Sequence, residues 1–138
     1  MCAGGMRRVK VPVWFTLSVS GVWGGCATPE SAELEPRLSV LETEIFGKRC
    51  SLSSCHGGPG PVRGLELEPG HAYDSLVNVE SFDGESIRVV PGDPDSSLLV
   101  QVLEGPVGTI RRMPVGGMLD DDELTAIREW IELGANRD

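Results

Sequence analysis

Apolar residues recur at helical spacing in several short segments, which are separated by stretches rich in glycine and proline. Residues 38–50 place four apolar side chains on one helical face: Leu38, Leu41, Ile45 and Phe46. We expect this helix to end at or just after Lys48. A shorter helix is predicted within residues 71–79, and residues 87–92 are expected to be extended.

Two later helices carry signals for their ends as well as apolar stripes. The first is expected to have Asp93 as its N-cap, Pro94 at its first helical position and Gly105 just after its end. The second places Asp120 and Glu123 at the spacing of a capping box. Because there is neither an internal repeat nor a credible sheet, the pattern predicts an all-α fold of four to five short helices joined by long loops.

The N-terminal segment has the three parts of an export signal. A basic stretch (Arg7, Arg8 and Lys10) is followed by an apolar run over residues 11–23 and by two glycines. The apolar run is too short to span a bilayer comfortably. Cys26 follows the glycines, and this arrangement resembles a bacterial lipoprotein signal peptide, in which the cysteine is lipidated after cleavage.

This resemblance implies three parts: a signal peptide over 1–25, a lipidated cysteine with a flexible acidic tether over 26–37, and one domain over 38–138. It implies an exported cell-envelope lipoprotein on the periplasmic side. Ala27 after the cysteine favours the outer membrane. Secretion without a lipid and an uncleaved anchor are the alternatives. Either Met1 or Met6 is the start of the chain.

The net charge limits the classes of partner that such a protein is expected to bind. The 138-residue chain has a formal net charge of -9. All 21 acidic residues follow residue 25, but three of the 12 basic residues precede it, so a chain that starts at residue 26 carries about -12. Nucleic acid binding depends on Lys and Arg neutralising phosphates and is therefore not expected. A protein partner is expected to offer a basic or apolar contact face.

The stretch CSLSSCH, residues 50–56, carries the candidate chemistry. Cys50 and Cys55 are the two thiols that remain after Cys2 is cleaved off and Cys26 is lipidated, and the compartment is oxidising. Haem attachment in c-type proteins uses Cys-x-x-Cys-His, whereas four residues separate the cysteines here. In the haem interpretation both thiols form thioethers and the adjacent His56 binds iron.

A sixth iron ligand should be a thioether or a second imidazole. The RRMP sequence offers Met113 in a loop before the last helix, with Met118 and His71 as weaker candidates. The preceding Arg111 and Arg112 are candidate partners for the haem propionates.

Three segments together resemble the small cytochrome c domains of exported bacterial proteins. They are IFGKRCSLSSCHGG, VVPGDPDSSLLVQVLEG and RRMPVGGMLDDDELTAIREWIELGA, and the resemblance covers residues 38–135. It implies a covalently held haem c, crossing first and last helices, and Phe46 and Trp130 near the crossing. It also implies a set of haem and iron contacts: Cys50, Cys55, His56 and Met113. The departure from the family is the four-residue gap between the cysteines.

The resulting interpretation is a membrane-tethered monohaem cytochrome that carries electrons and is not an enzyme. The main competing interpretation is a haem-free lipoprotein interaction module with a Cys50–Cys55 disulfide. A haem with an open sixth position would instead act as a sensor or a peroxidase-like site. A zinc site that includes His71 and a redox dithiol are two further possibilities for the cysteines.

Overall fold

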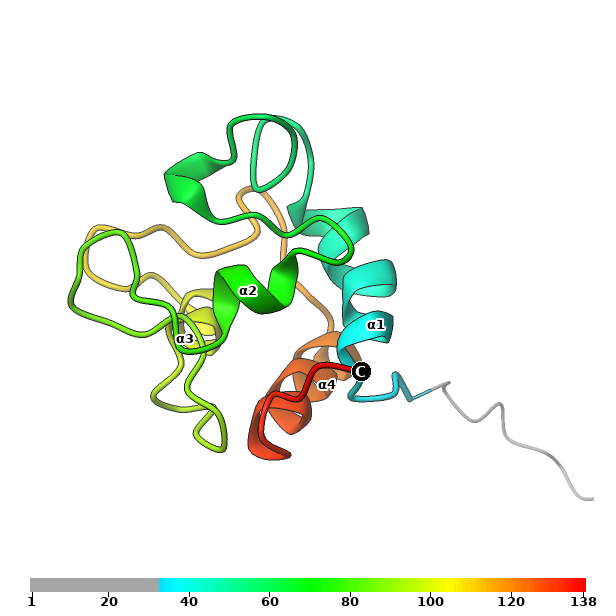
Figure 1. Cartoon of the computed structure of the whole chain (residues 1–138). Helices are drawn as coiled ribbons and strands as arrows, with labels where there is room; N and C mark the ends of the chain where they lie inside the picture. The colour runs from blue at the N-terminus through cyan, green and yellow to red at the C-terminus, as the bar shows by residue number, and fades with distance from the viewer. Residues whose placement is uncertain (1–32) are drawn as a thin grey trace, which may run out of the picture. The chain divides into compact units, whose positions relative to one another are not determined.

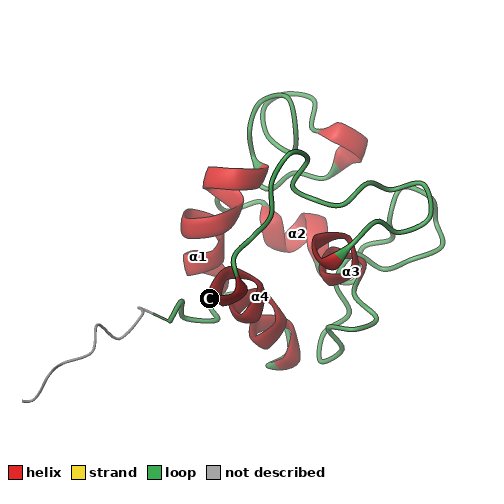
Figure 2. Ribbon diagram, turned by 180° about the vertical axis from the view of Figure 1, so that it is seen from behind, coloured by secondary structure: helices red, strands yellow, loops and turns green. Residues whose placement is uncertain are grey.

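A computed structural model describes residues 33–138. The signal peptide expected at 1–25, the lipidation of Cys26 and most of the tether lie outside these residues. The described part contains six helical segments and no strands: α1 (Leu38–Leu41), η1 (Glu42–Cys50), η2 (Val62–Gly64), α2 (Ala72–Leu76), α3 (Leu98–Glu104) and α4 (Asp121–Glu132). Figure 2 shows these helices joined by long loops, which confirms the predicted all-α class. No helix in this part is long and apolar enough to cross a membrane.

The first predicted helix is present, but it changes type along its length. It starts as the α-helical turn α1 and continues as η1, a π-helix that ends at Cys50. The Ser51 amide donates to the Phe46 carbonyl at 2.8 Å, which is the five-residue spacing of a π-helix. The helix thus runs two residues beyond the expected end at Lys48 and delivers the first cysteine to the loop that follows.

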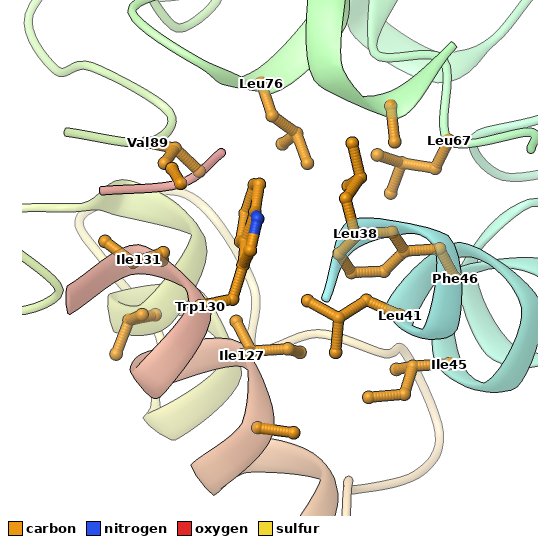
Figure 3. Close-up of a cluster of buried hydrophobic side chains, with 14 of the residues drawn as sticks. Leu38, Leu41, Ile45, Phe46, Leu67, Leu76, Val89, Ile127, Trp130 and Ile131 are labelled. Carbon is orange, nitrogen blue, oxygen red and sulfur yellow. The ribbon is translucent and has the colours of Figure 1, made fainter. Parts of the chain in front are cut away.

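α1 and α4 lie side by side and enclose the core (Figure 1). In Figure 3, Trp130 and Ile127 of α4 share one cluster with Leu41 and Phe46. Trp130 and Phe46 are both buried in this cluster, and the Trp130 Nε1 donates to the Asn136 carbonyl at 2.9 Å. Burying a large apolar side chain contributes about 1.5–3 kcal/mol, so this cluster stabilises the domain without any ligand.

The capping box predicted for the last helix is confirmed. The Glu123 amide donates to Asp120 Oδ1 at 2.9 Å, and the Asp120 amide donates to Glu123 Oε2 at 3.0 Å. The buried Glu123 carboxylate also forms an ion pair with Arg49, whose Nε lies 2.8 Å from Oε1. Since Arg49 precedes Cys50, this ion pair fixes the start of α4 against the end of η1.

The prediction that Asp93 caps a helix is wrong, because α3 begins at Leu98. Asp93 Oδ1 does accept the Ser96 amide, but the Ser97 hydroxyl donates back to the Asp93 carbonyl and closes a turn. The next amide, of Leu98, donates to the Ile87 carbonyl at 3.0 Å. The Asp-Pro signal therefore forms a turn that docks on the extended segment before it.

The helix within 71–79 is also shorter than the apolar residues in this segment would allow, because α2 covers only Ala72–Leu76. α2 ends at Leu76 because Val77 is extended and forms an isolated bridge with Val89. Asn78 then takes a left-handed conformation with φ 58°. The segment 87–92 pairs with residues 77–80 only through isolated bridges, as expected for a short extended piece outside any sheet.

Candidate cofactor-binding site

Two adjoining cavities lie beside the helical core, with volumes of about 120 Å³ and 180 Å³. They share six lining residues: His56, Val62, Leu65, Leu99, Val102 and Met113. The imidazole and the thioether singled out in the sequence thus lie on the wall common to both cavities. The remaining shared walls are aliphatic, which suits a ligand with an apolar body.

The larger cavity is also lined by Cys50 and Cys55. Both cysteines are free thiols in the structure. Burial raises the pKa of Cys50 to about 11, and the neighbouring Cys55 contributes to this shift. The two cysteines therefore line the same space.

The residues between the cysteines form a closed loop. The His56 amide donates to the Cys50 carbonyl at 3.0 Å, and the Cys55 amide donates to the Leu52 carbonyl at 2.8 Å. Gly57 makes this closure possible, because a Cβ at that position would lie 2.1 Å from the Ser51 carbonyl oxygen. The long gap is accommodated by this turn, and both cysteines still reach one cavity.

The loop after His56 folds back over the motif. The Val62 amide donates to the Cys55 carbonyl, and the Leu67 amide donates to the His56 carbonyl, both at 2.8 Å. The 3-10 turn η2 within this loop contributes Val62 and Arg63 to the cavity lining. A loop held in place over a hollow by its own backbone bonds is typical of a binding site.

One ring nitrogen of the His56 imidazole is buried but forms no hydrogen bond within residues 33–138. The Nδ1 atom is inaccessible and has no hydrogen-bond partner among the described residues. Burial lowers the pKa of His56, and the nearby backbone of Leu65 and Val62 opposes this shift without making a well-formed hydrogen bond to Nδ1. A buried polar atom without a partner is costly. The lowered pKa favours the neutral imidazole, which is the form that binds metals.

Among the three candidates for a second iron ligand, the structure brings only Met113 to the cavities. Its amide donates to the Val102 carbonyl at 2.8 Å, which fixes the loop before α4 against α3. Met118 is 59% exposed and lines neither cavity. His71 is also exposed, and its Nδ1 lies 3.8 Å from the Glu66 carboxylate.

Within residues 33–138, no three side chains of the His, Cys, Asp and Glu types lie together in a way that would hold a metal ion. In particular, His71 does not join the two cysteines at the cavity.

The arginines at the cavities are not the ones that the sequence singled out. Arg111 and Arg112 are exposed and line neither cavity, and Arg112 Nε donates to the Leu103 carbonyl at 3.0 Å. Arg63 and Arg88 line the smaller cavity instead. A signal for Arg88 was available in the sequence, because it is a lone charge inside the apolar run IRVV.

No protein family model matches the chain, and no curated protein or solved structure does so either. Function is therefore inferred from the residues and their arrangement. The donor set fits an iron porphyrin: a neutral imidazole with an unpartnered nitrogen, a thioether on the same wall, two free thiols and aliphatic surroundings.

Proposed function

We propose that this chain is a monohaem c-type cytochrome that carries electrons at the cell envelope and is tethered to the membrane through a lipidated Cys26. The observation that supports it most is the position of His56 and Met113. They come from loops far apart in the chain and line the wall shared by two cavities, one of which is also lined by Cys50 and Cys55.

The arrangement of the helices supports a cytochrome c-like fold as part of this proposal. α1 and η1 lead directly into the cysteines, and the loop that contains Met113 leads into α4. α4 packs against α1, with Trp130 in the core between them (Figure 3). This order, together with the contact between α1 and α4, supports the proposed fold.

Each residue of the site has a distinct role in this proposal. Cys50 and Cys55 would hold the cofactor through thioethers, and His56 and Met113 would bind its iron. A bound haem supplies an iron that accepts and releases one electron. Histidine and methionine together raise its potential, and the aliphatic walls keep water away. Because the protein would supply both of these ligands, no position would remain for a substrate, which favours a carrier over an enzyme.

The acidic surface determines the expected partner. The redox partner should present a basic or apolar face, and the membrane is reached through the lipid rather than through a charged surface of the domain. An outer-membrane, periplasmic location follows from the same lipoprotein proposal.

The decisive experiment tests for covalent haem. The full chain is expressed together with a cytochrome c maturation system, denatured and stained for haem at the mass of the protein. Haem that survives denaturation is expected, and the reduced pyridine spectrum then reports one thioether or two. A colourless protein whose Cys50 and Cys55 react with thiol reagents only after reduction would instead identify the disulfide-closed interaction module.

A matched pair of variants tests the distal ligand. Met113→Leu should change the visible spectrum and lower the midpoint potential, whereas Met118→Leu should leave both unchanged because Met118 lines neither cavity. Equal effects of the two variants would contradict ligation by Met113. Ready binding of carbon monoxide or cyanide to the unaltered protein would favour the sensor or peroxidase-like interpretation.

A further inference from the structure

The charged residues that line the two cavities are all arginines: Arg49, Arg63 and Arg88. Among residues 33–138, no acidic side chain lines either cavity, although the chain carries 21 acidic residues. Arg49 already forms an ion pair with Glu123. Arg63 and Arg88, which line the smaller cavity, form no ion pair with a carboxylate of residues 33–138.

Arg88 is half-buried and has no carboxylate partner within residues 33–138. Its guanidinium is held by backbone carbonyls: Nη1 donates to Ser75 at 2.8 Å and to Gly64 at 3.5 Å, and Nη2 donates to Arg63 at 3.3 Å. A guanidinium has five N–H donors. These bonds leave one donor on Nε and one on Nη2 for a further acceptor, and a carboxylate is the acceptor that a guanidinium binds most strongly.

Arg128 shows the contrast. It pairs with two carboxylates at the surface, those of Asp95 and Glu104. Arg88 lines a cavity, yet the described chain supplies it with no acid. Burial lowers the pKa of Arg88, and an unpaired charge in an apolar wall is costly. A carboxylate that is not part of the polypeptide would offset this cost.

We propose that Arg88, with Arg63 beside it, binds the carboxylate groups of the cofactor. This inference rests on the proposed function. In a haem, the edge that carries the two propionates lies opposite the edge that carries the two vinyl groups. The cysteines that would bond the vinyl groups line one cavity, the arginines line the other, and His56 and Met113 line both. This order along the site gives the cofactor one orientation.

The test is a redox titration of the haem-loaded protein and of its Arg88→Gln variant. Loss of the positive charge leaves a propionate uncompensated, which stabilises the ferric state. We expect the redox equilibrium to shift about tenfold toward the ferric form, or about 59 mV to lower potential for a one-electron couple. The potential should also become pH-dependent as the uncompensated propionate titrates. Arg63, Arg88 and the neutral His56 are the charged and titratable groups that line this cavity.

Arg111→Gln is the matched control, because it removes the same charge two residues before Met113 but from an exposed side chain. Its shift should be much smaller, since solvent and salt screen exposed charges. Equal shifts for Arg88→Gln and Arg111→Gln would overturn the proposal in favour of a general charge effect.

Arg88→Lys separates carboxylate binding from a purely structural role. It retains the charge but loses the fork that holds the carbonyls, so we expect it to restore most of the potential. If Lys and Gln shift the potential equally, Arg88 acts only by bracing the loops, and the proposal fails. Should Arg88→Gln not fold, Arg63→Gln tests the same cavity from an exposed position. An unaltered protein without covalent haem would instead refute the proposed function itself.

Discussion

The helical half of the domain and the half that surrounds the cavities differ in how fully their buried polar and charged groups are paired. In the helical half, formed by α1, η1 and α4, buried polar groups find partners within the chain. Trp130 donates to the Asn136 carbonyl, and Glu123 joins the capping box and Arg49. In the cavity half, the buried Nδ1 of His56 has no partner among the described residues, and Arg88 has no carboxylate partner there.

The two halves also differ in backbone. The cavity half contains the long loops over 51–71 and 105–120, and Figure 2 shows how much of the domain is loop. Residues of these loops line the two mostly aliphatic cavities. Long irregular loops in a compact domain usually serve a function. The helical half therefore pairs its buried polar groups internally, whereas the cavity half keeps hollow space and unpaired groups, which supports the proposed cofactor site.

The largest expected effect lies in the helical half. Trp130→Ala should lower the free energy of unfolding by about 3–5 kcal/mol, because it empties the centre of the core. Denaturant unfolding followed by circular dichroism measures this loss. Leu133→Ala, at an exposed position just after α4, should change stability by no more than about 0.5 kcal/mol. Similar losses in both variants would mean that Trp130 is not a core residue.

A smaller effect is expected where the cavity half is most constrained. Gly57→Ala should cost about 1–3 kcal/mol, because the new Cβ would meet the Ser51 carbonyl oxygen and push open the turn that closes the motif. Covalent haem per chain should fall with it. Gly60→Ala is the control, since a Cβ there meets nothing within 4 Å. An unchanged haem yield in Gly57→Ala would show that the turn is not needed for attachment.

Filling the cavities should affect the two forms of the protein in opposite directions. Leu99→Phe adds a ring to the wall that both cavities share, so the haem-free chain should gain about 0.5–2 kcal/mol from the filled space. The matured chain should carry less haem, measured as the pyridine haemochrome per protein. Leu133→Phe should leave this ratio unchanged. Full haem content in Leu99→Phe would place the cofactor elsewhere.

The smallest expected effect on stability comes from the contacts of Asp138, which connect the two ends of the described part of the chain. Asp138 accepts hydrogen bonds from Ser39 Oγ at 2.7 Å and from Arg37 Nε at 2.9 Å. These contacts, first the hydrogen bond from Ser39, lower the pKa of Asp138 to about 2. A lowered pKa stabilises the folded state above the unfolded value of about 3.9. This contribution is lost as the pH falls from about 4 toward 2.

Asp138→Asn should therefore flatten part of the dependence of stability on pH between about 5 and 2, which unfolding curves at several pH values measure. Glu132→Gln, at an exposed position in α4, provides the comparison. If both variants retain the pH dependence of the parent, the contacts of Asp138 do not contribute to stability.

Signals for helix ends predict the structure correctly where all of the hydrogen bonds involved lie within a few residues of one another. The Asp120–Glu123 capping box forms because all of its bonds lie within four residues. The Asp93-Pro94 signal does not start a helix. The same hydrogen bond from the Ser96 amide to the Asp93 side chain closes a turn, and the amides that follow this turn donate to the carbonyls of residues 87 and 88. A capping pattern alone does not reveal whether the next turn continues as a helix.

The candidate site shows the same limit. The CSLSSCH motif indicates Cys50, Cys55 and His56, and the RRMP sequence indicates Met113. The structure brings all four to adjoining cavities, while their chemical roles stay predictions. Arg111 and Arg112 were candidates for the propionates because they stand beside Met113 in the sequence. Adjacent residues in a loop point in different directions, however, and these two are exposed.

By itself, the sequence determined the helical class, the last helix with its cap, and the set of thiol, imidazole and thioether groups. These follow from residue types and from contacts within a few positions. Tertiary structure alone decided where α3 begins, which methionine reaches the cavity, and that Arg63 and Arg88 lie there in place of Arg111 and Arg112. Those outcomes depend on which loops fold over one another, and therefore on contacts between residues far apart in the chain.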